Sequence, residues 1–199
     1  KVYGTDGEFK GTWGAGTFSL PAGIATMQSG NFVVTDVDRH VVSLHAPDGV
    51  LLKQMGCWGS GDYQFNVPNF VTVDKDENII VSDTCNGCIK IYDKVGAFIR
   101  KFALSTAGQG QIKRPQGLCT DSNGNILVAD RDNNRISMYS HEGGFIRHVL
   151  ERKDSVRYPC DISINSEGQL AVVETHSGFL TKEPHHAVKL FQVMPPHSN

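Results

Sequence analysis

The chain has 199 residues, 19 of them basic and 21 acidic, and a formal net charge of −2. That length allows one domain with a sizeable core, and the balanced charge excludes a general attraction to nucleic acid. No run of about 18 apolar residues occurs, so we expect no membrane-spanning helix. Five cysteines, an odd number, argue against a disulfide framework and favour a reducing, cytoplasmic location.

Four prolines divide the chain into similar segments. They are Pro21, Pro68, Pro115 and Pro159, spaced 47, 47 and 44 residues apart. Each has an apolar residue three positions earlier and an acid fifteen positions later, the acids being Asp36, Asp83, Asp130 and Glu174. A fixed period of this length is typical of repeat architectures. We therefore divide the chain into repeats at residues 18–64, 65–111, 112–155 and 156–199.

Each repeat contains a succession of short strand-like runs separated by turn signals such as Asn123-Gly124. First strands are expected at 23–25, 70–73, 118–120 and 162–164, and second strands at 32–34, 79–81, 126–128 and 170–173. Third strands are expected at 42–44, 89–92, 136–139 and 188–191, and fourth strands at 51–52, 98–100 and 145–147. The pattern predicts four-stranded antiparallel meanders.

Hydropathy within these runs indicates how the sheets pack. The first two strands of each repeat are nearly continuous in Val, Ile and Leu, which predicts burial on both faces. The third alternates polar and apolar residues, which predicts a half-exposed strand. Such sheets cannot bury both faces alone, and radial stacking as the blades of an all-β propeller solves this.

The two ends of the chain fall inside repeats. Lys1-Val2-Tyr3, with Gly7 and Phe9, repeats the spacing of Lys90-Ile91-Tyr92, Gly96 and Phe98, so residues 1–17 match the end of a preceding repeat. The last repeat ends after its third strand, which gives 17 strands in all. We expect this chain to be part of a larger, six-bladed ring, with a closed four-bladed ring as the alternative.

Part of the third repeat resembles a known family. Residues 114–118, 121–130 and 133–136 are similar to the NHL repeat almost position for position, and weaker copies cover the rest of the chain. The fourth copy departs most, because it carries Glu174 and a longer loop through His176, His185 and His186. The resemblance implies an NHL β-propeller of the TRIM-NHL type, whose ubiquitin-ligase RING would lie outside this chain.

Charged residues divide unequally between the two faces of such a propeller. The turns after the first and third strands hold ten acids but only two bases, Lys75 and Lys94. The rest of the chain holds 17 bases and 11 acids, and this excess falls largely on the face where the prolines enter. Cations beside a ring and amide groups are what single-stranded RNA recognition uses.

TRIM-NHL propellers bind RNA on this same face, through residues around the proline motif and through the loops after the second strands. Carried over by position, the resemblance implies RNA contacts from Arg39, Asn69, Arg114, Gln116, Arg131 and Tyr158. It also implies a role in post-transcriptional regulation. Some TRIM-NHL propellers instead dock proteins, so a substrate-recognition platform for a ubiquitin ligase is the alternative.

Other groups of residues favour structure over chemistry. The recurring acids are expected to accept backbone N–H bonds from their own loops and to bind no metal. Cys85 and Cys88 have the spacing of half a zinc site, but no second pair accompanies them. The histidines of the long loop are read as surface residues. We therefore expect no catalytic residues, no cofactor and no enzymatic activity.

Overall fold

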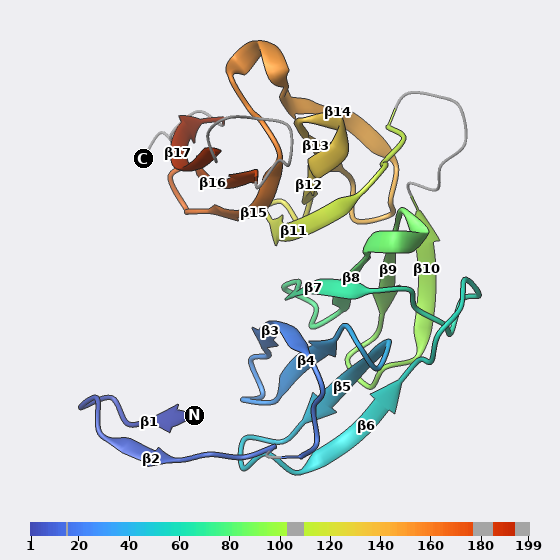
Figure 1. The fold of residues 1–199 in the computed structure, drawn as a ribbon, viewed down its shortest axis with the longest axis vertical. Coiled ribbons are helices and arrows are strands. Elements are labelled where there is room, and N and C mark those ends of the chain that lie inside the picture. The colour runs from blue at the N-terminus through green and yellow to red at the C-terminus, as the bar shows by residue number, and fades with distance from the viewer. Residues whose placement is uncertain (15, 103–109, 177–184, 194–199) are drawn as a thin grey trace.

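The computed structural model describes residues 1–14, 16–102, 110–176 and 185–193. Every sheet in this part of the chain is antiparallel, and consecutive strands pair with one another (Figure 1). The first blade contains β3 (Pro21–Thr26), β4 (Phe32–Asp36), β5 (Val41–His45) and β6 (Leu51–Met55). The second contains β7 (Pro68–Val73), β8 (Ile79–Asp83), β9 (Cys88–Tyr92) and β10 (Phe98–Phe102).

The third blade contains β11 (Pro115–Thr120), β12 (Ile126–Asp130), β13 (Arg135–Tyr139) and β14 (Phe145–Leu150). The fourth has three described strands, β15 (Pro159–Ile164), β16 (Gln169–His176) and β17 (His185–Gln192), and β1 (Val2–Tyr3) pairs with β2 (Phe9–Gly11) before the first blade. Single 3₁₀ turns are η1 (Thr84–Asn86), η2 (Arg131–Asn133) and η3 (Arg152–Asp154). The described residues thus form the 17 strands expected from the sequence.

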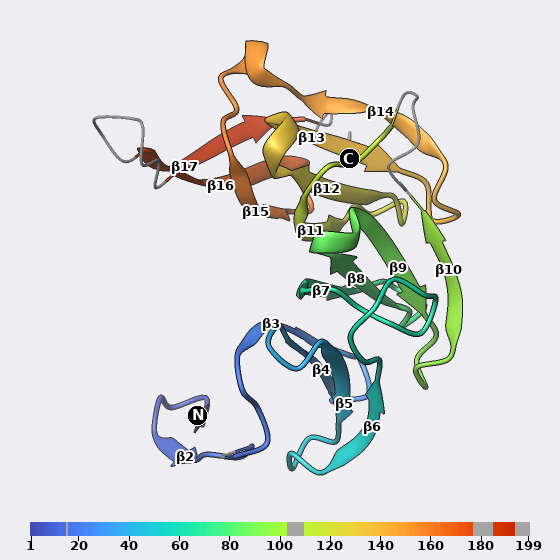
Figure 2. The same ribbon diagram turned by 45° about the vertical axis from the view of Figure 1, so that its right-hand side comes forward.

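The blades follow one another around an arc, with their first strands on its inner side and their fourth strands on its outer side (Figures 1 and 2). Strands β3, β7, β11 and β15 contact one another in succession. All four prolines are the first residues of these inner strands, where the missing N–H of proline does least harm. Each proline thus begins the innermost strand of its blade. The arrangement is that of an all-β propeller.

Three apolar clusters hold neighbouring blades together. One joins Val33 and Val42 of the first blade to Val81 and Phe65 on the second. Corresponding clusters join the second blade to the third and the third to the fourth. Because every cluster draws on two blades, stacking buries sheet faces that one repeat alone leaves in water.

The expected pattern of burial is wrong for two strand positions. The third strands β5, β9 and β13 are almost wholly buried, because both of their faces are covered, in β5 partly by Trp13 and Phe18 before the first blade. Their polar members, Ser43, Lys90 and Ser137, are buried and hydrogen-bonded. The first strand β3, by contrast, is largely exposed, because it packs on β7 of the following blade but no four-stranded blade precedes it in the described residues.

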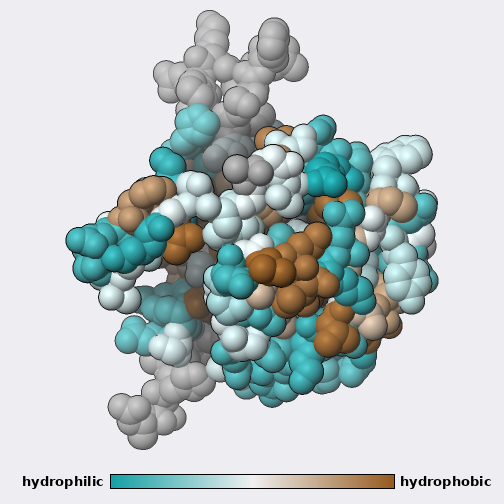
Figure 3. Space-filling view, turned by 90° about the horizontal axis from the view of Figure 1, so that it is seen from below, coloured by the Kyte–Doolittle hydropathy of each residue, from teal (hydrophilic) through white to brown (hydrophobic). Residues whose placement is uncertain are grey.

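Apolar side chains are also exposed on the molecule's periphery. Val50, Leu51 and Leu52 at the start of β6 are each about half exposed or more. A view from below Figure 1 shows apolar residues gathered into a patch among hydrophilic ones (Figure 3). Patches of this kind commonly mark contact surfaces.

Candidate nucleic-acid interface

In each blade, the recurring acid ties the end of the second strand to the entry of the first. Its carboxylate accepts the N–H of the residue two positions before the proline: Ser19 to Asp36 at 2.7 Å, Asn66 to Asp83 at 2.7 Å, Lys113 to Asp130 at 3.1 Å and Arg157 to Glu174 at 2.9 Å. The residue after each acid donates its N–H to the carbonyl just before the proline. This double connection explains the fixed 15-residue spacing.

The expectation for these acids is therefore half confirmed. They do accept backbone N–H bonds, but for Asp83 and Asp130 the donors precede the first strand instead of lying in the loop after the acid. That loop contributes side-chain amides, from Asn86 and Asn133. Asp36 differs in also accepting the N–H of Arg39 from its own loop. Burial raises the pKa of Asp36, but these N–H bonds outweigh it and leave the pKa below its usual value.

A cation on the third strand completes the connection in three blades. Lys90 lies 2.8 Å from Asp83, Arg135 lies 3.1 Å from Asp130 and Lys189 lies 2.8 Å from Glu174. These three bases belong to the basic excess counted from the sequence, yet they are held by carboxylates inside the blades. The face is less basic than its composition suggests.

Four other cations of this face lie at the entries to the third and fourth blades. Lys113, Arg114, Arg152 and Arg157 are exposed, and no carboxylate in the described residues pairs with any of them. Lys113 and Arg157 hold the same repeat position in adjacent blades, two residues before the proline. These four residues are called the basic cluster below.

Arg131 and Tyr158 lie beside the basic cluster and contact each other. The guanidinium of Arg131 sits over the Tyr158 ring, 5.8 Å from its centroid, and the N–H of Arg131 donates to the carbonyl of Arg114 at 3.1 Å. The N–H of Tyr158 donates to Asn134 Oδ1 at 2.9 Å, which fixes Tyr158 at a φ of 46°. The structure thus brings together three of the six residues expected to bind RNA.

Two more of the six form a separate pair, and the last stands apart. Asn69 Nδ2 donates to Gln116 Oε1 at 3.0 Å, joining the second residues of β7 and β11, and Gln116 is only 7% exposed. Arg39 is exposed in the first blade, where its guanidinium donates to the carbonyl of Thr17. The six residues expected to bind RNA therefore lie in three separate groups on one face.

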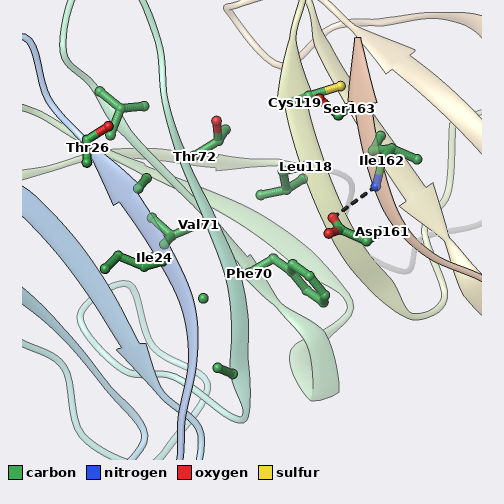
Figure 4. Close-up of a pocket in the computed structure, with 14 residues that line it drawn as sticks. Ile24, Thr26, Phe70, Val71, Thr72, Leu118, Cys119, Asp161, Ile162 and Ser163 are labelled. Carbon is green, nitrogen blue, oxygen red and sulfur yellow. Dashed lines mark hydrogen bonds between the residues drawn. The ribbon is translucent and has the colours of Figure 1, made fainter. Parts of the chain in front are cut away.

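Inside the arc lies a cavity of about 610 Å³, lined by the four first strands (Figure 4). Ile24, Val71, Leu118 and Ile162 contribute apolar surface, and Asp161 is the one charged residue among the described residues of the lining. Asp161 Oδ1 accepts the N–H of Ile162 at 2.9 Å. Burial raises the pKa of this carboxyl, and the Ile162 N–H opposes that rise.

Residues with metal-binding potential do not converge in the described part of the chain. Cys85 is exposed, whereas Cys88 is buried and burial raises its thiol pKa to about 12. The loop between His176 and His185 lies outside the described residues. No helix in the described residues is long and apolar enough to cross a membrane.

One exposed aromatic residue on this face escaped the sequence reasoning. Trp58 lies in the connection that enters β7 and is 70% exposed. A signal was present, because the pattern Gly-x-Trp-Gly-x-Gly occurs at both residues 11–16 and residues 56–61. The pattern alone does not say which tryptophan packs against the core.

Several solved structures share this fold. The crystal structure of a nidogen/laminin complex has a TM-score of 0.69 and 18% identity, over 89% of this chain and 62% of that one. A streptogramin B lyase structure has a TM-score of 0.59 and 18% identity, over 92% and 56%. A catalytically inactive virginiamycin B lyase from Staphylococcus aureus, with quinupristin, has the same score and identity over 87% and 55%. At this identity the likeness shows the fold alone.

Sequence comparison is more specific but covers less of the chain. A search of curated proteins finds no match. This chain spans less than two thirds of the length of those three structural neighbours. The family model described as "NHL repeat" matches residues 65–92 and 113–139, which run from the segment before the first strand through the third strand of the second and third blades. The chain therefore carries NHL repeats, and its blades are arranged as in a β-propeller.

Proposed function

We propose that this chain binds single-stranded or looped RNA across the entries to its third and fourth blades, and that it acts by binding, without catalysis. The observation that carries the proposal is the basic cluster, four exposed cations without carboxylate partners in the described residues, next to Arg131, whose guanidinium lies over the Tyr158 ring. Post-transcriptional regulation is the cellular role that the resemblance to TRIM-NHL propellers favours.

Each group on this face matches one part of an RNA strand. Phosphates attract the cations of the basic cluster, and much of the affinity then comes from released counterions. Unpaired bases stack on aromatic rings and on guanidinium planes, both of which Arg131 and Tyr158 provide. The amide of Asn69, which the buried Gln116 holds in place, supplies a polar group at the inner rim. The opposite face, with its excess of acids, repels the same strand.

The test is a selection from a random RNA pool, followed by affinity measurements at several salt concentrations. Log affinity should fall with log salt at about −0.7 per phosphate contact on a single strand. Arg114→Ala should flatten this slope by roughly one contact. The matched controls are Lys75→Ala and Lys94→Ala, exposed lysines on the opposite face, which should leave affinity and slope unchanged.

Protein docking is the second candidate, as a substrate-recognition platform for a ubiquitin ligase. The exposed Val50, Leu51 and Leu52 favour it, since clustered apolar residues commonly mark interfaces. A nidogen/laminin complex is among the structural neighbours, although at 18% identity. If no RNA binds in a salt-sensitive way, or if the Lys75 and Lys94 controls weaken binding as much as Arg114→Ala, protein docking replaces the RNA proposal.

A further inference from the structure

We infer that Trp58 is a second base-stacking platform, which extends the proposed RNA site from the fourth blade back to the second. The inference rests on the proposed function and names a residue outside the expected set. Its basis is a 70% exposed indole on a backbone that buried side chains hold in place. An unpaired nucleobase is the ligand that this position fits.

The loop that carries Trp58 is fixed by hydrogen bonds from its own blade. Within the loop, the N–H of Phe65 donates to the carbonyl of Cys57 at 2.8 Å, and the N–H of Gly59 donates to the carbonyl of Phe65 at 3.0 Å. From strand β9, the buried Lys90 Nζ donates to the carbonyl of Gly61 at 2.8 Å, and the Tyr92 hydroxyl donates to the carbonyl of Asp62 at 3.1 Å. A loop held in this way loses little backbone freedom on binding, which favours affinity.

Comparison with Trp13 shows that Trp58 is not needed by the core. Trp13 holds the same place in the Gly-x-Trp-Gly-x-Gly pattern, and its ring packs on Phe32 and His45 with centroids 4.4 and 5.1 Å away. Trp58 makes no aromatic contact in the described residues and remains exposed. The same motif therefore supplies a packing residue in one repeat and a surface ring in the next.

Trp58 connects to the basic cluster through turn η1. Asn86 of that turn donates its side-chain N–H to the carbonyl of Gly59, next to Trp58, at 2.8 Å. The following Gly87 lies so close to the segment entering β11 that a Cβ there would be 3.5 Å from the carbonyl of Lys113. A chain of contacts thus links the Trp58 loop through η1 to the segment that carries Lys113 and Arg114.

The chemistry around Trp58 favours a base over an apolar protein segment. A protein hot spot needs surrounding apolar contacts that exclude water. The nearest neighbours of Trp58 along its loop are small or polar: Cys57, Gly59, Ser60 and Gly61. The exposed ring of Tyr63 lies further along the loop and packs on Phe98. Stacking of one base needs only the face of the ring, and cations that can hold its phosphates lie on the segment that η1 contacts.

The experiment uses the two tryptophans as each other's control. In a Trp13→Phe variant, Trp58 is the sole tryptophan, and its emission is followed as a labelled pool of random single-stranded RNA is added. We expect the tryptophan emission to be quenched until binding saturates, with the same midpoint as a titration that follows the fluorescence anisotropy of the labelled RNA. The converse variant, Trp58→Phe, retains Trp13 and should show no quenching. Trp58→Ala should weaken RNA binding roughly 5- to 150-fold, with the melting temperature and the salt slope unchanged. Trp58→Phe, which keeps an aromatic ring, should retain most of the wild-type affinity.

The possible failures can be told apart. If RNA binds but the emission of Trp58 and the affinity of Trp58→Ala are both unchanged, this inference is wrong and the proposed function stands. If affinity falls only together with the melting temperature, Trp58 is a structural residue and the inference is also wrong. If no RNA binds to the wild-type protein, both proposals fail.

Discussion

Lys90 and Asp83 form an ion pair 2.8 Å long in which neither side chain has any exposed surface. The lysine also donates to the carbonyls of Gly61 and Gln64, and the carboxylate also accepts from Asn66 and Asn86. Both charges therefore have several partners, as buried charges require. This pair links the centre of the second blade to the loop that presents Trp58.

Removal of Lys90 should destabilise the protein strongly. In Lys90→Met the apolar stem is retained but Asp83 is left buried without its cation, and we expect a loss of about 3–5 kcal/mol in the free energy of unfolding. The comparison is Lys189→Met, since Lys189 is 27% exposed in its pair with Glu174 and water can replace it more easily. Urea denaturation measures both. If the two variants lost equal free energy of unfolding, burial of the Lys90–Asp83 pair would not explain the loss in Lys90→Met.

His40 and Asn134 hold the same repeat position, four residues after the acid, and both bond to the next blade. His40 Nδ1 accepts the N–H of Val67 at 3.1 Å, as Asn134 does for Tyr158. Val67 has a φ of 62°, which is unusual for a β-branched residue and needs support from its surroundings.

We expect His40→Ala to lower the free energy of unfolding by about 1–2 kcal/mol, because the Val67 N–H loses its acceptor. His40→Asn should be close to neutral, because asparagine performs this role in the third blade and tolerates the positive φ of 56° found at His40. Urea midpoints of the two variants decide the matter. An Asn variant as unstable as the Ala variant would argue against the hydrogen bond.

Gly117 lies where the third and fourth blades approach most closely. A Cβ at this position would stand 2.5 Å from both the Cα and the Oδ1 of Asp161. Gly117→Ala should therefore force the two inner strands apart and cost about 1–3 kcal/mol. Gly144→Ala is the control, since its nearest contact is the Ser140 hydroxyl at 3.3 Å. Thermal melting of both variants tests this, and a stable Gly117→Ala protein would show that β15 can move.

Most of the fold could be predicted from the repeat, because proline and acid pair in register at the start of each blade. The pairs are Pro21 with Asp36, Pro68 with Asp83, Pro115 with Asp130 and Pro159 with Glu174. Burial was harder to predict. A lysine in an alternating strand is normally an exposed residue, and the sequence does not show that Lys90 has Asp83 and two carbonyls within reach.

The candidate site was predictable only in its outline. Position in the repeat placed Arg114, Arg131 and Tyr158 on one face, but their contact depends on how the third blade packs on the fourth. Counting charges could not separate Arg135, bound to Asp130, from Arg157, which pairs with no carboxylate among the described residues. Likewise, two copies of one motif gave a packed Trp13 and an exposed Trp58.

His148 should make stability depend on pH. Burial lowers the pKa of His148 below 6.5, and the nearby positive charge of Arg135 lowers it further, although Glu151 and Asp130 oppose this. Arg135 Nη1 can only donate, so Nε2 of His148 accepts at 3.2 Å and its Nδ1 donates to Ser137 Oγ at 3.1 Å. Protonation of Nε2 would break the bond to Arg135 and set two positive charges against each other.

The sign of the effect follows from which state binds more protons. Between the lowered pKa of folded His148 and the ordinary value of 6.5, the unfolded chain is protonated at this residue and the folded protein is not. The free energy of unfolding should therefore fall as the pH drops below about 6.5, by at most about 1.4 kcal/mol per pH unit from this residue. In His148→Gln, whose side chain stays neutral, that part of the slope should vanish, while near pH 8 the slopes of variant and wild type should agree. Urea denaturation from about pH 5 to 8 measures it. An acid slope as steep in the variant as in the wild type would assign the effect to other groups, His45 first among them, because burial lowers its pKa too.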